Sequence, residues 1–257
     1  MITSADNQQL KSVRSLMERA SARRKEKLFV AEGVRMFLES PPDLVHRIYA
    51  SDDFMKKSAH ADRIRALPHV IVSDPVFKKI SDTHTPQGVL MVMKMPEYSE
   101  AFFEKRYGDG LFLIANRIQD PGNIGTMIRT AEAAGAAGVI MDKECADIFN
   151  PKVIRSTMGS VYRVPFLITD ELPVFVDRMK AGGVKVVAGD LKGQLFYEAP
   201  DIPGGRAVII GNEGSGISDE LLEKADIKLK IPMEGKVSSL NAAVSAALFM
   251  YQMKRRI

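Results

Sequence analysis

The sequence predicts an α/β protein built from two different parts, and three observations support this. From about residue 110 to the C-terminus, short apolar segments alternate with segments of helical spacing. Strands that are apolar along their whole length, alternating with helices, are typical of a mostly parallel sheet covered on both faces. The chain before residue 96 has shorter, mixed segments, and a charged stretch rich in Pro and Gly separates the two parts. We therefore predict a small α/β domain at 1–96, a linker at 97–109 and a larger α/β domain at 110–257.

Each element is assigned from its periodicity and its flanking turn residues. In the first part, β-branched segments predict strands at 27–33, 45–51, 69–74 and 88–95, and helical spacing predicts helices at 13–20 and 34–40. In the second part, strands are expected at 110–116, 137–142, 163–169, 184–190, 206–213 and 227–232. Helices are expected up to about 134 and at 150–159, 172–183 and 240–256. Pro165 favours an edge position for its strand, because Pro cannot donate to a ladder.

The composition excludes several classes of protein and of site. Apolar residues make up 46% of the 257 positions, which argues against disorder, and no apolar run approaches the roughly 18 residues that span a bilayer. The only cysteine is Cys145, so no intrachain disulfide can form and a reducing, cytoplasmic location is expected. All four histidines precede residue 85, so the larger domain cannot hold a His-based triad or zinc site of its own.

Basic residues are concentrated near the N-terminus, although the net charge is only +4. Such a cluster could lie along the phosphates of a nucleic acid, or it could be the solvated face of a helix. The residues considered for contact with phosphate are Arg23, Arg24, Lys25, Lys27 and Arg35.

The first of three polar loops follows the strand at 110–116 and reads "QDPGNIGTMIRTAEAAG" (119–135). Asn123 is expected to N-cap a helix that starts at Ile124, with Gly135 near its end. Arg129 and Glu132 lie away from the apolar stripe of this helix. They could form an ordinary surface ion pair, or Arg129 could face a ligand.

The other two loops follow later strands. "IIGNEGSGIS" (209–218) contains three glycines around Glu213, which allows close approach of the backbone to a ligand, or makes an ordinary turn. It matches neither the phosphate-binding loop nor the dinucleotide fingerprint. "IPMEGKVSSLNAAVSAAL" (231–248) places Ser238, Ser239 and Asn241 before a helix, which is more than one cap requires. Because ligands of parallel sheets bind at the carboxyl ends of strands, these loops are candidates for one site.

Together, in this order and at these separations, the three stretches resemble the SpoU/TrmH-type RNA ribose 2′-O-methyltransferases of the SPOUT class, over roughly 110–257. "RRKEKLFVAEGVRMFLE" in the first part is similar to the small substrate-binding domain that often precedes them. The resemblance implies a C-terminal trefoil knot, S-adenosylmethionine as cofactor, no metal, and RNA as substrate. It also implies a homodimer, with the last helix and the helix of the first loop near its interface. Ribosomal RNA is expected, with transfer RNA as the alternative.

The resemblance also implies roles for individual residues. The catalytic set would be Arg129, Asn123, Glu213, Ser239 and Asn241, with Arg129 also on the RNA. The cofactor contacts would be Gly189, Gly211, Ile231, Ser239 and Leu240. A guanidinium gives up a proton poorly, so we expect Arg129 to position the ribose and stabilise charge rather than act as a base. The pair Asn116–Arg117 departs from the family pattern and is expected near the rim of the RNA site.

Two other functions are compatible with parts of the pattern. A non-catalytic RNA-binding assembly factor would explain the basic cluster but not the polar residues of the three loops. A metabolic α/β enzyme with a nucleotide cofactor is disfavoured, because the phosphate-binding fingerprints are absent from the sequence.

Overall fold

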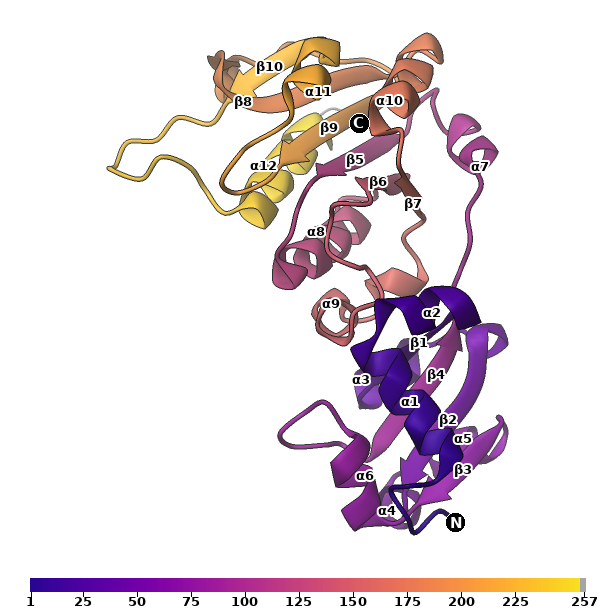
Figure 1. Ribbon diagram of the computed structural model, residues 1–257. Coiled ribbons are helices and arrows are strands. Elements are labelled where there is room, and N and C mark those ends of the chain that lie inside the picture. Colours follow the sequence, from indigo (N-terminus) through magenta and orange to yellow (C-terminus); the bar gives the residue numbers. More distant parts are fainter. Residues whose placement is uncertain (255–257) are drawn as a thin grey trace. The chain divides into compact units, whose positions relative to one another are not determined.

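The computed structural model describes residues 1–254, and they form two compact units (Figure 1). Unit 1 contains Met1–Glu97 together with Asp147–Tyr162. Unit 2 contains Tyr98–Ala146 and the chain from Arg163 onward. The prediction of one continuous domain at 110–257 does not account for Asp147–Tyr162, which folds with the first unit. Arg255 and Arg256, expected in the last turn of the final helix, lie outside the described residues.

Unit 1 is built on a mixed sheet of four strands in the order β1-β4-β2-β3. β4 pairs antiparallel with both β1 and β2, and β3 pairs parallel with β2. The strands are β1 (Leu28–Glu32), β2 (Val45–Ser51), β3 (His69–Val72) and β4 (Val89–Lys94). The helices are α1 (Gln8–Glu18), α2 (Ala20–Glu26), α3 (Val34–Glu39), α4 (Asp52–Lys57), α5 (Ala61–Arg65), α6 (Asp74–Ile80) and α9 (Pro151–Thr157), with 3-10 turns η1 (Pro42–Leu44) and η2 (Ser160–Tyr162).

Local chemistry explains how α1 covers this sheet. The Asn7 side chain accepts from the backbone N–H of Gln9 and so satisfies a free donor at the helix start. Leu10, Val13 and Leu16 recur at helical spacing and are buried in the core formed with β-strand residues. The helix therefore begins at Gln8, earlier than the predicted 13–20.

The segment Asp147–Tyr162 packs into the hydrophobic core of unit 1. The rings of Phe149 and Phe29 lie 4.9 Å apart between centroids, and Tyr162 also lies against Phe29 at 6.5 Å. Val153 and Ile154 of α9 are fully buried. The aromatic and aliphatic burial of this segment explains why it folds with β1, the strand that carries Phe29.

Unit 2 contains a six-stranded sheet in the order β10-β8-β9-β5-β6-β7, and every pairing in it is parallel, as predicted. The strands are β5 (Leu111–Asn116), β6 (Gly138–Asp142), β7 (Phe166–Thr169), β8 (Lys185–Leu195), β9 (Arg206–Gly211) and β10 (Ile227–Lys230). The helices are α7 (Glu100–Glu104), α8 (Pro121–Ala133), α10 (Leu172–Ala181), α11 (Asp219–Lys224) and α12 (Ala242–Lys254), with the 3-10 turn η3 (Phe196–Glu198). The strand that follows Pro165 is β7, and its edge position is confirmed.

The central strands of this sheet are buried on both faces, since every residue of β5 is buried. α8 and α12 pack against each other, and α12 also contacts β9 and β5. α10 and α11 pack together and contact β8. No helix within residues 1–254 has both the length and the apolar character needed to cross a membrane.

Candidate functional site

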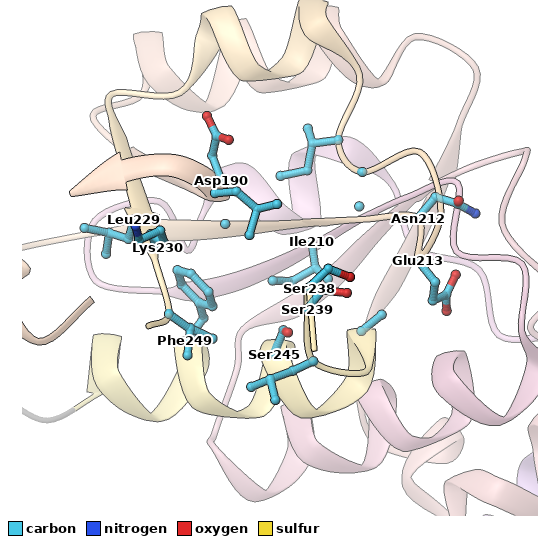
Figure 2. Close-up of a pocket in the computed structure, with 18 of the residues that line it drawn as sticks. Asp190, Ile210, Asn212, Glu213, Leu229, Lys230, Ser238, Ser239, Ser245 and Phe249 are labelled. Atoms are coloured by element: carbon cyan, nitrogen blue, oxygen red, sulfur yellow. The ribbon is translucent and has the colours of Figure 1, made fainter. Parts of the chain in front are cut away.

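A cavity of about 270 Å³ opens in unit 2 where β9 and β10 end and α12 begins (Figure 2). Residues of β8, of the loop 211–217 and of the loop 231–240 complete its wall. The structure places all five predicted cofactor contacts in this lining: Gly189, Gly211, Ile231, Ser239 and Leu240. The lining combines apolar side chains with hydroxyl, carboxylate and backbone groups, as small-molecule sites do.

Three of the predicted catalytic residues form one hydrogen-bonded chain beside this cavity. The side-chain amide of Asn241 donates to Asn123 Oδ1 at 2.9 Å. The amide of Asn123 donates in turn to the Glu213 carboxylate. These contacts connect the start of α12, the first turn of α8 and the loop after β9, so the three loops meet as predicted.

The helix starts that carry the two asparagines differ from the prediction in one respect. α8 begins at Pro121, and its N-cap is Asp120, whose carboxylate accepts from the backbone N–H of Asn123 at 2.8 Å. The prediction that Asn123 caps a helix beginning at Ile124 is therefore wrong. Pro is favoured in the first turn because its fixed φ suits the helix and its missing N–H costs nothing there. This cap leaves the Asn123 side chain free to join Asn241 and Glu213.

Asn241 does the capping at α12, because its Oδ1 accepts from the backbone N–H of Ala243 at 2.9 Å. Its amide nitrogen is then directed to Asn123, so one side chain both starts the helix and joins the polar chain. Ser239 lies on the loop just before this cap and lines the cavity.

The loop after β9 is shaped by close backbone contact and by one side chain that the sequence analysis missed. A Cβ at Gly211 would stand 2.3 Å from the backbone of Gly216 and Ile217, so no larger residue fits without moving the loop. Asn212 Oδ1 accepts from the N–H groups of Gly214 and Ser215 at 2.9 and 3.0 Å. An Asn before a Gly-rich turn is the signal that could have identified this turn-forming role.

Arg129 stands apart from the polar chain. It lies on the exposed side of α8 and is not among the residues that line the cavity. The alternative interpretation, an Arg129–Glu132 ion pair, is not what the structure shows, because Glu132 pairs with Arg163. Within residues 1–254 the Arg129 guanidinium has no hydrogen bond or ion pair, so it is available to an anion.

The cavity also has lining residues that were not predicted. Ser245 and Phe249 extend from α12 into the cavity (Figure 2), which Ala242 of the same helix also lines. The Phe249 ring packs close to Gly189, since a Cβ at Gly189 would stand 3.2 Å from it. Their spacing of three and four residues along a helix is the sequence signal that could have found them. Asp190 contributes a carboxylate, which accepts from the Lys192 backbone N–H at 3.1 Å.

Asn116 and Arg117 serve mainly to hold loops together. Asn116 is buried, donates to Asp142 at 2.7 Å and accepts from the N–H of Ser218 at 2.9 Å. It does not lie at an exposed rim, contrary to expectation. Arg117 adopts φ 57°, and its guanidinium reaches the carbonyl of Gly216 at 3.4 Å.

In the basic cluster of unit 1, four of the five predicted RNA contacts are exposed and one is buried. Arg24, Lys25, Lys27 and Arg35 are exposed, although Lys27 also pairs with Glu97. Arg23 is only 3% exposed and binds Asp147 through two nitrogens, at 3.0 and 2.5 Å, and the carbonyls of Leu16 and Met17. Its guanidinium is fully used inside the protein. Arg23 is therefore corrected from an RNA contact to a structural residue.

The lone cysteine is not a nucleophile. Burial, reinforced by Asp142, raises the pKa of the Cys145 thiol to about 12, so it stays protonated at neutral pH. Within residues 1–254 there is also no cluster of three or more His, Cys, Asp or Glu side chains that could hold a metal ion.

The model of the SpoU rRNA Methylase family matches residues 110–251, more than half of the chain. The chain belongs to the SpoU rRNA methylase family. A second model, the MRM3-like substrate binding domain, matches residues 7–91 of this SpoU-family chain. The resemblance stated from the sequence is confirmed.

Individual relatives cover nearly the whole SpoU-family chain. The 23S rRNA (guanosine(2553)-2′-O)-methyltransferase RlmP of Bacillus subtilis is 36% identical over 98% of both chains. Among solved structures, the SpoU methyltransferase AviRb from Streptomyces viridochromogenes in complex with AdoMet is 26% identical, with a TM-score of 0.85 over 97% of this chain and 98% of that one. An AdoMet-bound rRNA methyltransferase from Sinorhizobium meliloti is 27% identical, with a TM-score of 0.85 over 100% and 97%.

Proposed function

We propose that this chain transfers a methyl group from S-adenosylmethionine to a ribose 2′-hydroxyl in ribosomal RNA. The observation that carries the proposal is the meeting of two features in unit 2. Five predicted cofactor contacts line one cavity, and the Asn241–Asn123–Glu213 chain lies at its edge. The AdoMet-bound relatives of the same fold support the choice of cofactor.

The reaction forms a bond between the ribose oxygen and the methyl carbon, breaks the bond between that carbon and the sulfonium sulfur, and releases the hydroxyl proton. The protein must hold the two reactants in line, which can supply several of the roughly 7–11 kcal/mol available from proximity. In our proposal Arg129 binds the phosphate next to the target ribose and stabilises developing charge. The hydrogen bonds from Asn241 to Asn123 and from Asn123 to Glu213 keep the loop after β9 in place beside the ribose. Ser239 lies next to the reacting groups.

The cofactor would lie bent among the loops 211–217 and 231–240, in the trefoil knot that the family resemblance implies. The carboxyl ends of β9 and β10 bring these loops to one side of the cavity. Apolar lining residues, among them Ile210, Leu229 and Phe249, suit the adenine, and the serines suit the methionine portion.

A homodimer is part of the proposal, and α12 offers a surface for it. Val244, Leu248 and Tyr251 recur at helical spacing on α12 and are 49%, 41% and 51% exposed. Replacing Leu248 by Glu should therefore shift the chain toward monomer, because a carboxylate would be buried at the interface. Light scattering checks the mass, with Val174→Glu on α10, also exposed, as the control. A monomeric wild type, or a dimer that Leu248→Glu leaves intact, contradicts this assignment.

Unit 1 would supply RNA affinity through its exposed basic residues Arg24, Lys25, Lys27 and Arg35. A cytoplasmic location follows from the proposed substrate and stays a prediction.

The decisive experiment combines cofactor binding with mapping of the product. Calorimetry should show that the purified chain binds S-adenosylmethionine. Mass spectrometry of RNA from cells with and without the gene should show one ribose methylation lost from ribosomal RNA. If the methyl group is lost from transfer RNA instead, transfer RNA is the substrate and the assignment to ribosomal RNA is wrong. Tight RNA binding without cofactor binding would indicate a non-catalytic assembly factor.

A further inference from the structure

Unit 1 contains a second cavity, of about 660 Å³, that is distinct from the one in unit 2. Its lining comes from the end of β2, from α4 and α6, and from the loop 81–88 just before β4. This volume falls in the range of about 300–1,000 Å³ that small-molecule sites occupy. None of the functional residues assigned above lines it.

Close backbone packing forms the inner end of this cavity. Gly88 has φ 85°, and a Cβ there would stand 2.8 Å from both the Phe54 Cβ and the Ser51 Oγ. The Ser51 hydroxyl accepts from the backbone N–H of Phe54 at 3.2 Å and is also hydrogen-bonded to the Asp74 carboxylate. The cavity wall is therefore built into the strand ends and the start of α4.

The lining contains apolar side chains. Phe54 is partly exposed, Phe77 is buried, and Pro86 of the loop 81–88 also contributes. A partly exposed aromatic ring at a cavity wall is suited to stacking with a planar group.

The same lining contains hydrogen-bond donors and cationic side chains that a ligand could contact. Gln87 Oε1 accepts from the Val34 backbone N–H at 2.8 Å, which fixes the side chain and leaves its amide N–H groups available. Within residues 1–254, the Lys78 ammonium and the ring of His60 make no hydrogen bond or ion pair. A planar ligand with a negative charge would find donors in the same lining as the aromatic ring.

The two carboxylates of the lining are already compensated. Asp53 pairs with Lys57 at 2.6 Å. Asp74 accepts from the backbone N–H of Asp53 at 3.1 Å, and this hydrogen bond lowers the pKa of the Asp74 carboxyl. Their oxygens can accept from base amino groups, while the lysines of the lining limit their repulsion of phosphate.

We infer that this cavity holds one unpaired nucleotide of the substrate RNA, its base stacked on Phe54 and its phosphate bound by Lys78. Single-stranded RNA is recognised in this way, by bases stacked on aromatic side chains and hydrogen-bonded along their edges. The inference rests on the proposed function for the identity of the ligand as RNA. It adds a recognition site in unit 1 that selects RNA with an accessible, unstacked base.

The first test measures RNA affinity of the full chain by filter binding to ribosomal RNA from cells that lack the gene. The double variant Phe54→Leu with Lys78→Gln should bind about tenfold more weakly, because stacking and one phosphate contact are lost. The matched control is Lys79→Gln, the neighbouring exposed lysine, which does not line the cavity and should bind as the wild type does. Calorimetric affinity for S-adenosylmethionine should be unchanged in both variants. Equal affinity of the double variant and the control overturns the inference.

The second test needs no variant and therefore does not depend on the folding of one. Ultraviolet crosslinking of the wild-type chain to the same RNA, followed by mass spectrometry, should attach nucleotides to peptides covering 51–60 or 74–88. Crosslinks confined to other peptides overturn the inference. A wild type that crosslinks in these peptides but does not bind the cofactor would instead refute the proposed methyltransferase function and leave the nucleotide site standing.

Discussion

Replacing Arg129 by alanine is expected to lower the rate of methyl transfer by about 10²- to 10³-fold, the loss typical when one charge-stabilising group is removed. The guanidinium is exposed on α8 and has no partner within the described residues, so the change should leave the fold and its stability intact. Because Arg129 does not line the cavity of unit 2, affinity for S-adenosylmethionine should also be unchanged. Single-turnover methyl transfer and calorimetry measure the two quantities separately.

Two further variants sharpen the interpretation of Arg129. Arg129→Lys keeps the charge but not the planar fork, so partial activity would indicate a simple charge contact, and activity as low as that of Arg129→Ala would indicate bidentate binding of phosphate. The control is Arg178→Ala, which removes a surface arginine of α10 that pairs with Glu100 of α7. If Arg129→Ala transfers methyl groups as fast as the wild type, the catalytic assignment of this residue is wrong.

Replacing Asp147 by alanine should destabilise unit 1 by about 3 kcal/mol, because it leaves the buried Arg23 guanidinium without its counterion. Arg23 is 3% exposed, and Asp147 is the acidic group that it contacts. The Asp147 carboxylate also accepts from the Phe149 backbone N–H at 2.9 Å, so the turn that begins the segment would loosen as well. Urea denaturation measures the free energy of unfolding, and hydrogen exchange identifies the unit affected.

The neighbouring ion pair provides a control for this stability prediction. Arg155 and Asp82 lie 2.7 Å apart in unit 1, with side chains 32% and 44% exposed. Breaking this pair with Asp82→Ala should cost less than about 1 kcal/mol, as solvent-screened pairs do. The double variant Asp147→Ala with Arg23→Met should recover much of the lost stability, because an apolar side chain needs no counterion. Equal losses for Asp147→Ala and Asp82→Ala would contradict the importance of burial.

The sequence was informative wherever one local pattern decided the structure. Continuous apolar strands predicted the parallel sheet, and Pro165 predicted an edge strand, because both follow from hydrogen bonding along a single segment. The three polar loops were expected to meet because parallel strands present their carboxyl ends at one edge. In the structure, the hydrogen bonds Asn241–Asn123 and Asn123–Glu213 join the three loops.

The features that escaped prediction depend on residues far apart in the chain. Arg23 looked like its neighbours Arg24 and Lys25, and only the position of Asp147, 124 residues away, makes it a buried structural group. The cavity of unit 1 likewise combines segments around residues 54, 78 and 87, whose side chains show no common pattern in sequence. The cap of α8 is a different case, because Asp120 followed by Pro121 is a local signal for a helix start that the prediction of an Asn123 cap overlooked.

The return of Asp147–Tyr162 to unit 1 means that the polypeptide passes between the two units three times. A protease that cuts once, between Glu97 and Tyr98, would therefore give two fragments that stay associated, since one fragment still carries a piece of the other's core. For the same reason, exchanging unit 1 between homologues requires two grafts, one at the N-terminus and one between β6 and β7. A chimera made with a single junction would leave Phe29 and Arg23 facing a segment that evolved with a different partner.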